Sequence, residues 1–220
     1  MRTVVFDLDG TLADTSADLL AAANACFTGL GHGPLLTQAD ALTAFHGGRA
    51  MLRLGFERLG PGWTEADVDD QYPHLLAAYE AGIDRETRIY PGAVAAVEAL
   101  RAAGFRTAIC TNKPFRLAEI LRGRLGIRDL FGSVVGADTL AVRKPDPAPY
   151  VLSVERAGGA VARSMLVGDT DTDRRTARAA GVPVVLVGFG PEGPGVARLE
   201  PDALIRHFDE LPGLAERLIP

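Results

Sequence analysis

Residues 3–11 read TVVFDLDGT, and this stretch decides the fold class. Residues 3–6 form a short apolar run rich in β-branched side chains, which is typical of a strand buried on both faces of a parallel sheet. Two aspartates follow directly, Asp7 and Asp9, and Gly10 then permits a sharp exit from the strand. Because strand side chains alternate between faces, the two carboxylates share one face if the chain stays extended between them. The stretch therefore predicts a strand that ends in paired carboxylates.

Further apolar runs alternate with helical patterns along the rest of the chain. They lie at residues 106–110, 133–135, 164–167 and 183–187. This alternation predicts an α/β fold with a doubly wound parallel sheet, a Rossmann-like core with helices on both faces.

Residues 17–85 break this alternation, because they contain alanine- and leucine-rich helical stretches and no convincing strand. They interrupt the βαβ pattern after a single strand. We therefore expect an α/β core made of residues 1–16 and 86–220, with residues 17–85 inserted as a small helical domain.

Composition limits the classes of partner. The chain has 220 residues, a hydrophobic fraction of 47% and a net charge of -5, and this mildly acidic balance argues against nucleic acid and anionic membranes, which both require a basic face. No apolar run approaches the roughly 18 residues that would span a bilayer. The N-terminus runs straight into strand-like sequence without a signal peptide, so we expect a cytoplasmic protein.

Lysine is scarce in this chain. Only Lys113 and Lys144 are lysines among the 23 basic residues, and each directly precedes a proline in a loop. A compact ammonium is a natural point-charge partner for phosphate and carboxylate. Their placement indicates a local role in binding charged groups.

Polar side chains gather where the predicted strands end. TNK at residues 111–113 follows one strand, GDTDTD at residues 168–173 follows another, and Lys144 lies in the loop before an intervening helix. The carboxyl ends of parallel strands meet at one edge of the sheet, where ligands bind. Carboxylates that converge there repel one another unless a cation is present, and Mg²⁺ prefers such hard oxygen ligands.

The spacing of the last acidic motif suggests how its carboxylates meet. Asp169 and Asp173 are four residues apart, so a helical turn that starts at Asp169 would bring both to one face. Asp171 lies off that face, and we assign it no role.

Four motifs in this order, FDLDGTLADT, TNK, RKP and GDTDTD, resemble those of the haloacid dehalogenase superfamily. The helical insert resembles the small α-helical cap of its phosphoglycolate phosphatase-like members. The resemblance implies a Mg²⁺-dependent phosphatase that hydrolyses a small phosphorylated metabolite through an aspartyl-phosphate, as a monomer or a homodimer.

The resemblance also implies catalytic roles for individual residues. Asp7 is the nucleophile, and Asp9 is the general acid that later serves as the base. Thr111 holds the phosphoryl oxygens together with the backbone amides around Leu8 and Asn112. Lys144 neutralises charge on the nucleophile and on the transferring group.

A metal site is implied by the same resemblance. Mg²⁺ is held by the Asp7 side chain, the Asp9 backbone carbonyl and Asp169, with Asp173 as a ligand directly or through water.

The helical insert offers one candidate contact to substrate. HGGR at residues 46–49 is similar to the cap loop of β-phosphoglucomutase-like members, so Gly48 and Arg49 are candidate substrate-binding residues. Arg49 either grips the non-transferred end of the substrate, for instance a carboxylate, or begins a helix and points to water.

Two alternatives to a phosphatase stay open. A β-phosphoglucomutase-like sugar phosphate mutase would share all four core motifs and a helical cap. A non-catalytic, phospho-accepting signalling or binding protein would also gather acidic residues, a threonine and a lysine at strand ends. It would lack a helical insert after the first strand and the DLDGT pattern.

Overall fold

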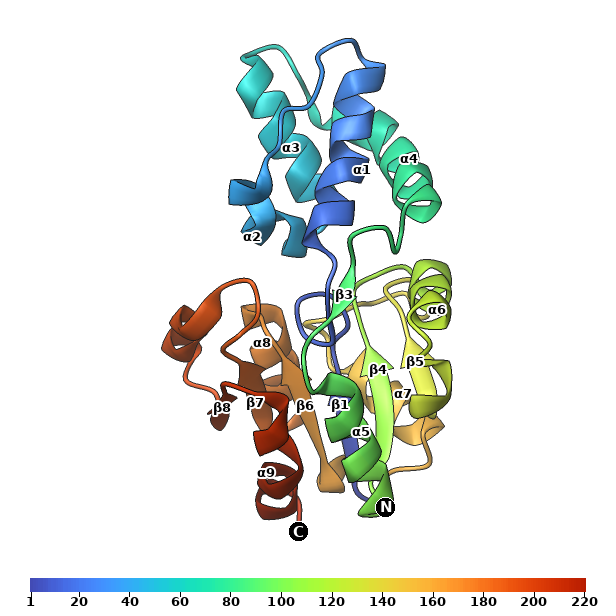
Figure 1. Ribbon diagram of the computed structural model, residues 1–220, viewed down its shortest axis with the longest axis vertical. Coiled ribbons are helices and arrows are strands. Elements are labelled where there is room, and N and C mark those ends of the chain that lie inside the picture. Colours follow the sequence, from blue (N-terminus) through green and yellow to red (C-terminus); the bar gives the residue numbers. More distant parts are fainter. The chain divides into compact units, whose positions relative to one another are not determined.

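A six-stranded parallel sheet forms the centre of one of the two units into which the chain divides (Figure 1). The computed structural model describes residues 1–220. The sheet unit contains Met1–Asp14 and Ile89–Pro220, and the helical unit is Thr15–Arg88. The units thus divide after residues 14 and 88, whereas the sequence placed the junctions after residues 16 and 85.

The strands of the sheet follow the order β5-β4-β1-β6-β7-β8, and each neighbouring pair is parallel. Their bounds are Thr3–Phe6 (β1), Arg106–Cys110 (β4), Ser133–Val135 (β5), Ser164–Gly168 (β6), Val184–Val187 (β7) and Ala203–Ile205 (β8). The first three match the predicted ranges, whereas β6 continues through Gly168, β7 begins at Val184 and β8 was not predicted. The doubly wound α/β fold is thus confirmed.

Helices cover both faces of this sheet. Their bounds are Ala93–Ala102 (α5), Phe115–Arg124 (α6), Ala148–Arg156 (α7), Asp171–Ala180 (α8) and Leu211–Leu218 (α9). Helix α7 packs on β5, β4 and β1, α8 packs on β6 and β7, and α5 packs on β4 and α9. Figure 1 shows α5 and α9 in front of the sheet and α7 and α8 behind it. Every residue of β1 is buried, which explains why apolar side chains follow one another from Val4 to Phe6.

The strand register sets which residues meet at the carboxyl edge. Phe6 pairs with Ile109 on one side and with Val167 on the other. The residues that follow these strands therefore emerge side by side. The chain passes from β1 to β4 and β5, then returns to β6 on the opposite side of β1. This reversal next to β1 is where open α/β sheets bind their ligands.

The helical unit consists of four α-helices packed around an aromatic centre. They are Ser16–Gly29 (α1), Ala41–Phe45 (α2), Gly48–Leu59 (α3) and Glu65–Ala81 (α4). The rings of Phe27 and Phe56 meet edge to face at 5.3 Å, and Trp63 stacks on Phe56 at 6.0 Å. Two short strands, Ala13–Asp14 (β2) and Arg88–Ile89 (β3), pair where the chain passes between the units. No helix has the combination of length and apolar character that crossing a membrane requires.

A buried carboxylate ties the two ends of the helical unit together. Asp18, in the first turn of α1, accepts hydrogen bonds from the backbone amides of Glu86 and Thr87 and from the Thr87 hydroxyl. The side chains of Asp18 and Thr87 are withdrawn from water. One side chain therefore links the start of the helical unit to the segment with which the unit ends.

We expect Asp18→Ala to lower the free energy of unfolding by about 2–4 kcal/mol, because buried donors at Thr87 lose their acceptor. Urea unfolding followed by circular dichroism measures this change. Glu86→Ala is the matched control, since it removes an exposed carboxylate but keeps the backbone amide that binds Asp18. Equal stability of the two variants would contradict the proposed tie.

Candidate active site

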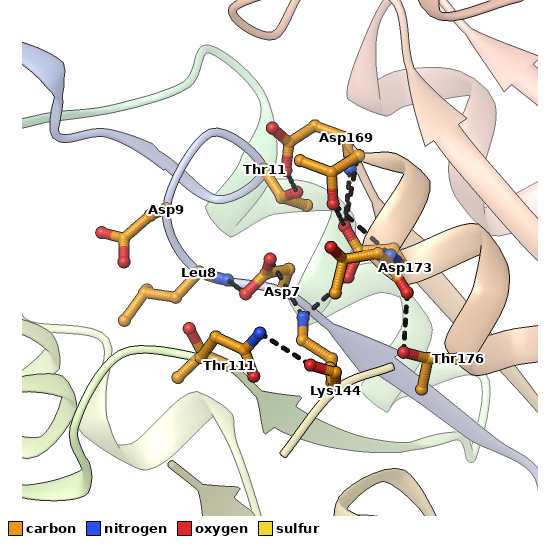
Figure 2. A network of polar contacts seen from close by, with 12 residues as sticks. Asp7, Leu8, Asp9, Thr11, Thr111, Lys144, Asp169, Asp173 and Thr176 are labelled. Carbon is orange, nitrogen blue, oxygen red and sulfur yellow. Dashed lines mark hydrogen bonds and ion pairs between the residues drawn. The ribbon is translucent and has the colours of Figure 1, made fainter. Parts of the chain in front are cut away.

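Three carboxylates meet at the carboxyl edge of the sheet and form what we call the aspartate cluster: Asp7, Asp169 and Asp173. One oxygen from each lies within 4.8 Å of the others, and Figure 2 shows the three side chains converging. Asp7 directly follows β1 and Asp169 directly follows β6, whereas Asp173 belongs to the first turn of α8. The residues that follow the predicted strands at 3–6 and 164–167 therefore do come together.

The start of α8 brings Asp173 back toward the strand. Thr170 caps the helix and its hydroxyl donates to Asp173 Oδ2 at 2.7 Å. The same oxygen accepts from the Asp169 amide at 3.2 Å. The prediction of a helical turn starting at Asp169 is wrong, because α8 begins only at Asp171. Capping, rather than helical spacing, brings the two carboxylates together.

The Lys144 ammonium lies between two members of the aspartate cluster. Its Nζ is 3.0 Å from Asp7 Oδ2 and 2.6 Å from Asp173 Oδ1. The side chain is only 1% exposed, so these charges interact with little screening by water. The Asn112 side chain donates to the Lys144 carbonyl at 3.0 Å and fixes the loop that carries the lysine.

Burial and mutual repulsion change the ionisation of this cluster. Burial raises the pKa of Asp7 to about 6; the Asp173 and Asp9 charges add to this effect, while Lys144 opposes it. Burial and then the Asp173 and Asp7 charges raise the pKa of Asp169 well above its usual value. Burial disfavours the Lys144 ammonium, but the Asp173 and Asp7 charges outweigh it and raise its pKa.

These values predict how the stability of metal-free protein depends on pH. Folded Asp7 keeps its proton up to about pH 6, whereas the unfolded carboxyl loses it near 3.8. The native state therefore binds more protons within this window, so the contribution of Asp7 to the free energy of unfolding falls as pH rises through it. The total fall is no more than about 3 kcal/mol.

Urea unfolding in the presence of a chelator, at a series of pH values from 4 to 7, tests this dependence. Asp7→Asn lacks the titrating carboxyl. The free energy of unfolding of wild type minus that of this variant should therefore fall as pH rises across the window. A difference that grows with pH would contradict the prediction.

The turn after β1 supports the cluster. Gly10 has a φ of 79°, which the absence of a side chain permits. The Leu8 amide donates to Asp7 Oδ1 at 2.7 Å, and the Thr11 hydroxyl donates to Asp169 Oδ1 at 2.7 Å. This contact of Thr11 with Asp169 was not predicted. The only signal for it in the sequence is the position of Thr11 in the FDLDGTLADT motif.

A second ion pair lies beside the cluster. Lys113 Nζ is 2.9 Å from Asp9 Oδ1 and 3.0 Å from Asp9 Oδ2. Sequence reasoning did not predict this pairing, although the scarcity of lysine singled out Lys113. Both lysines of the chain thus pair with aspartates near the end of β1. The Asp9 carboxylate does not belong to the aspartate cluster, and the predicted ligand role of its backbone carbonyl stays a prediction.

The predicted phosphoryl-binding residues follow β4. Thr111 is buried at the same edge of the sheet (Figure 2), and its hydroxyl oxygen accepts from the Lys113 amide at 3.2 Å. Asn112 holds the Lys144 loop through its side chain, a structural contact that was not predicted. Their binding of phosphoryl oxygens stays a prediction.

The two candidate residues of the insert belong to the helical unit. Gly48 begins α3, and Arg49 follows it. The Arg49 guanidinium pairs with Asp69 and lies over the Tyr72 ring, 4.6 Å from its centroid. Arg49 therefore has partners within its own unit and does not simply point to water.

Comparison with known proteins agrees with this arrangement of sheet and carboxylates. The family model for haloacid dehalogenase-like hydrolases matches residues 1–181. The chain belongs to the haloacid dehalogenase-like hydrolase family.

Similar proteins carry a more specific description. Phosphoglycolate phosphatase of Agrobacterium fabrum is 38% identical over 98% of this chain and 93% of its own, and that of Mesorhizobium japonicum is 39% identical over 98% and 96%. A crystal structure of a predicted phosphoglycolate phosphatase from Haemophilus somnus shares the fold, with a TM-score of 0.85, 24% identity and 97% coverage of both chains. Within its family, the protein is a phosphoric monoester hydrolase.

Proposed function

We propose that this protein is a Mg²⁺-dependent phosphatase that hydrolyses a small phosphorylated metabolite, in the manner of a phosphoglycolate phosphatase, through a phosphoryl group carried on Asp7. The observation that carries the proposal is the contact of the buried Lys144 ammonium with Asp7 inside the aspartate cluster. This contact directs a positive charge to the oxygen atoms where phosphoryl transfer would take place.

The aspartate cluster fits a divalent cation. When all three carboxylates are ionised, they exceed the single ammonium, that of Lys144, by two negative charges in a largely buried site. Asp7 and Asp169 offer hard oxygen ligands, and the Asp9 carbonyl and Asp173 complete the proposed set. Both oxygens of Asp173 are engaged by Lys144 and Thr170, which favours its acting through water. When bound, Mg²⁺ would neutralise phosphoryl charge and allow the ionised form of Asp7 near neutral pH.

The first chemical step belongs to Asp7. Its carboxylate oxygen attacks phosphorus and forms an oxygen–phosphorus bond, while the bond from phosphorus to the ester oxygen breaks. The leaving oxygen takes the proton of the Asp9 carboxyl. The Lys144 ammonium, fixed 3.0 Å from Asp7 Oδ2, orients the nucleophile and offsets the negative charge of the transferring group.

The second step returns the enzyme to its starting state. The Asp9 carboxylate now accepts a proton from water, and the water oxygen attacks phosphorus. The bond between Asp7 and phosphorus breaks, which releases phosphate and restores the Asp7 carboxylate. Asp9 regains its proton in this step, so the cycle is balanced. Thr111 and the amides of Leu8 and Asn112 are the proposed donors to the phosphoryl oxygens.

The substrate class is inferred from the relatives. Two proteins of this length with 38% and 39% identity are phosphoglycolate phosphatases, so 2-phosphoglycolate is the first candidate. Gly48 and Arg49 remain proposed contacts, and Arg49 would have to exchange Asp69 for substrate to make one. The enzyme class disfavours the alternative of a non-catalytic, phospho-accepting protein.

We expect wild type to release phosphate from 2-phosphoglycolate in Mg²⁺ and not in a chelator. Asp7→Asn should lower kcat by at least about 10³-fold, because the amide is a poor nucleophile. Asp171→Asn is the matched control: this aspartate of the same acidic motif is exposed and outside the cluster, so its kcat should stay close to wild type. Steady-state phosphate release measures both variants.

A panel of small phosphoesters that includes β-glucose 1-phosphate separates the remaining alternatives. Interconversion of the sugar phosphate with little release of phosphate would favour the mutase. Activity that survives in Asp7→Asn would contradict the assignment of the nucleophile.

A further inference from the structure

The ion pair between Asp9 and Lys113 keeps the proposed acid away from the nucleophile. The ammonium contacts both carboxylate oxygens, at 2.9 and 3.0 Å. Figure 2 shows the Asp9 side chain turned away from the aspartate cluster, toward which Asp7 points. Asp9 must therefore change position before it can serve a leaving group next to Asp7.

The lysine is the fixed partner of this pair. Its backbone amide donates to the Thr111 hydroxyl at 3.2 Å, and its carbonyl accepts from the Ala137 amide at 2.9 Å. The Lys113 side chain is 3% exposed, compared with 18% for Asp9. Because Asp9 is shorter and more accessible, whereas Lys113 is almost fully enclosed, Asp9 is the side chain with room to turn.

Proton donation by Asp9 conflicts with its two contacts to Lys113. In the observed position both Asp9 oxygens face the ammonium. To donate its proton, one of them must instead face the ester oxygen, so Asp9 cannot keep both contacts while it donates. The ester oxygen must lie within hydrogen-bond reach of the turned Asp9 carboxyl. Because that short side chain starts 2.9 and 3.0 Å from the ammonium, its turn leaves the first atoms of the leaving group near Lys113. An acidic group one carbon away from the ester oxygen would reach this ammonium.

We infer that Lys113 determines substrate specificity by binding the second anionic group of the substrate in exchange for the Asp9 carboxylate. The task of Asp9 in this exchange rests on the proposed function. In an ester with a carboxylate or similar group close to the phosphoryl group, that group binds the Lys113 ammonium in place of Asp9. Asp9 can then turn toward the ester oxygen. Esters without such a group leave Asp9 paired with Lys113.

Two ligands that cannot be hydrolysed test this exchange by calorimetric titration in Mg²⁺. Both 3-phosphonopropionate and propylphosphonate have a phosphonate on three carbons, but only the former ends in a carboxylate. Wild type should bind 3-phosphonopropionate more tightly. Lys113→Met should weaken its binding roughly 10- to 100-fold, the range expected for a lost hydrogen bond to a charged group. Its affinity for propylphosphonate should stay unchanged.

A second variant probes the competition itself. Asp9→Ala removes the carboxylate that occupies Lys113, so it should bind 3-phosphonopropionate more tightly than wild type does and propylphosphonate equally well. This arm does not depend on the folding of Lys113→Met, which thermal unfolding checks. Arg49→Ala is the rival variant, because Arg49 is the other candidate for the anionic end.

Equal weakening of both ligands by Lys113→Met would show that the lysine only positions Asp9, and would overturn the inference. A preference that survives Lys113→Met or is lost in Arg49→Ala, or no gain in Asp9→Ala, would overturn it as well. Failure of wild type to hydrolyse any ester would instead contradict the proposed function. The two outcomes can be told apart, because the binding preference is measured without turnover.

Discussion

A buried ammonium between two buried carboxylates is the interaction on which the carboxyl edge of this sheet depends. Strand β1 delivers Asp7, the capped start of α8 delivers Asp173, and the loop between β5 and α7 delivers Lys144. Losing one partner of such a buried ion pair typically costs about 3–5 kcal/mol, because an uncompensated charge remains. The same three elements therefore hold Asp7, the proposed nucleophile, in place, so the stability of the sheet edge and the proposed chemistry depend on one set of contacts.

The sheet could be predicted where its strands are buried on both faces. Val184–Val187 (β7), for example, has a continuous apolar, β-branched sequence, and all of its residues are buried. Ala203–Ile205 (β8) escaped prediction for a physical reason: it is an edge strand of three residues, paired only with β7 and partly exposed. A short edge strand needs little apolar sequence, so its pattern is weak.

The convergence of the site was predictable, but the pairing of its side chains was not. Parallel strands in register must present their following residues at one edge, so the meeting of Asp7 with Asp169 follows from topology. The choice of Lys113 as the partner of Asp9 depends on the directions of loop side chains, which sequence spacing does not specify. Contacts inside the helical unit, such as that of Arg49 with Asp69, are equally invisible to motif reasoning.

The most direct test of the central claim is to look for the phosphoryl group on Asp7. Enzyme mixed with 2-phosphoglycolate and Mg²⁺ would be quenched in acid during the first turnover, and its peptides analysed by mass spectrometry. Asp9→Asn would be used as well, because loss of the proposed base slows hydrolysis of the intermediate without changing which residue carries the phosphoryl group. We expect one phosphoryl group on Asp7, absent from Asp7→Asn. Product formation with no phosphorylated peptide, or with the group on another residue, would contradict it.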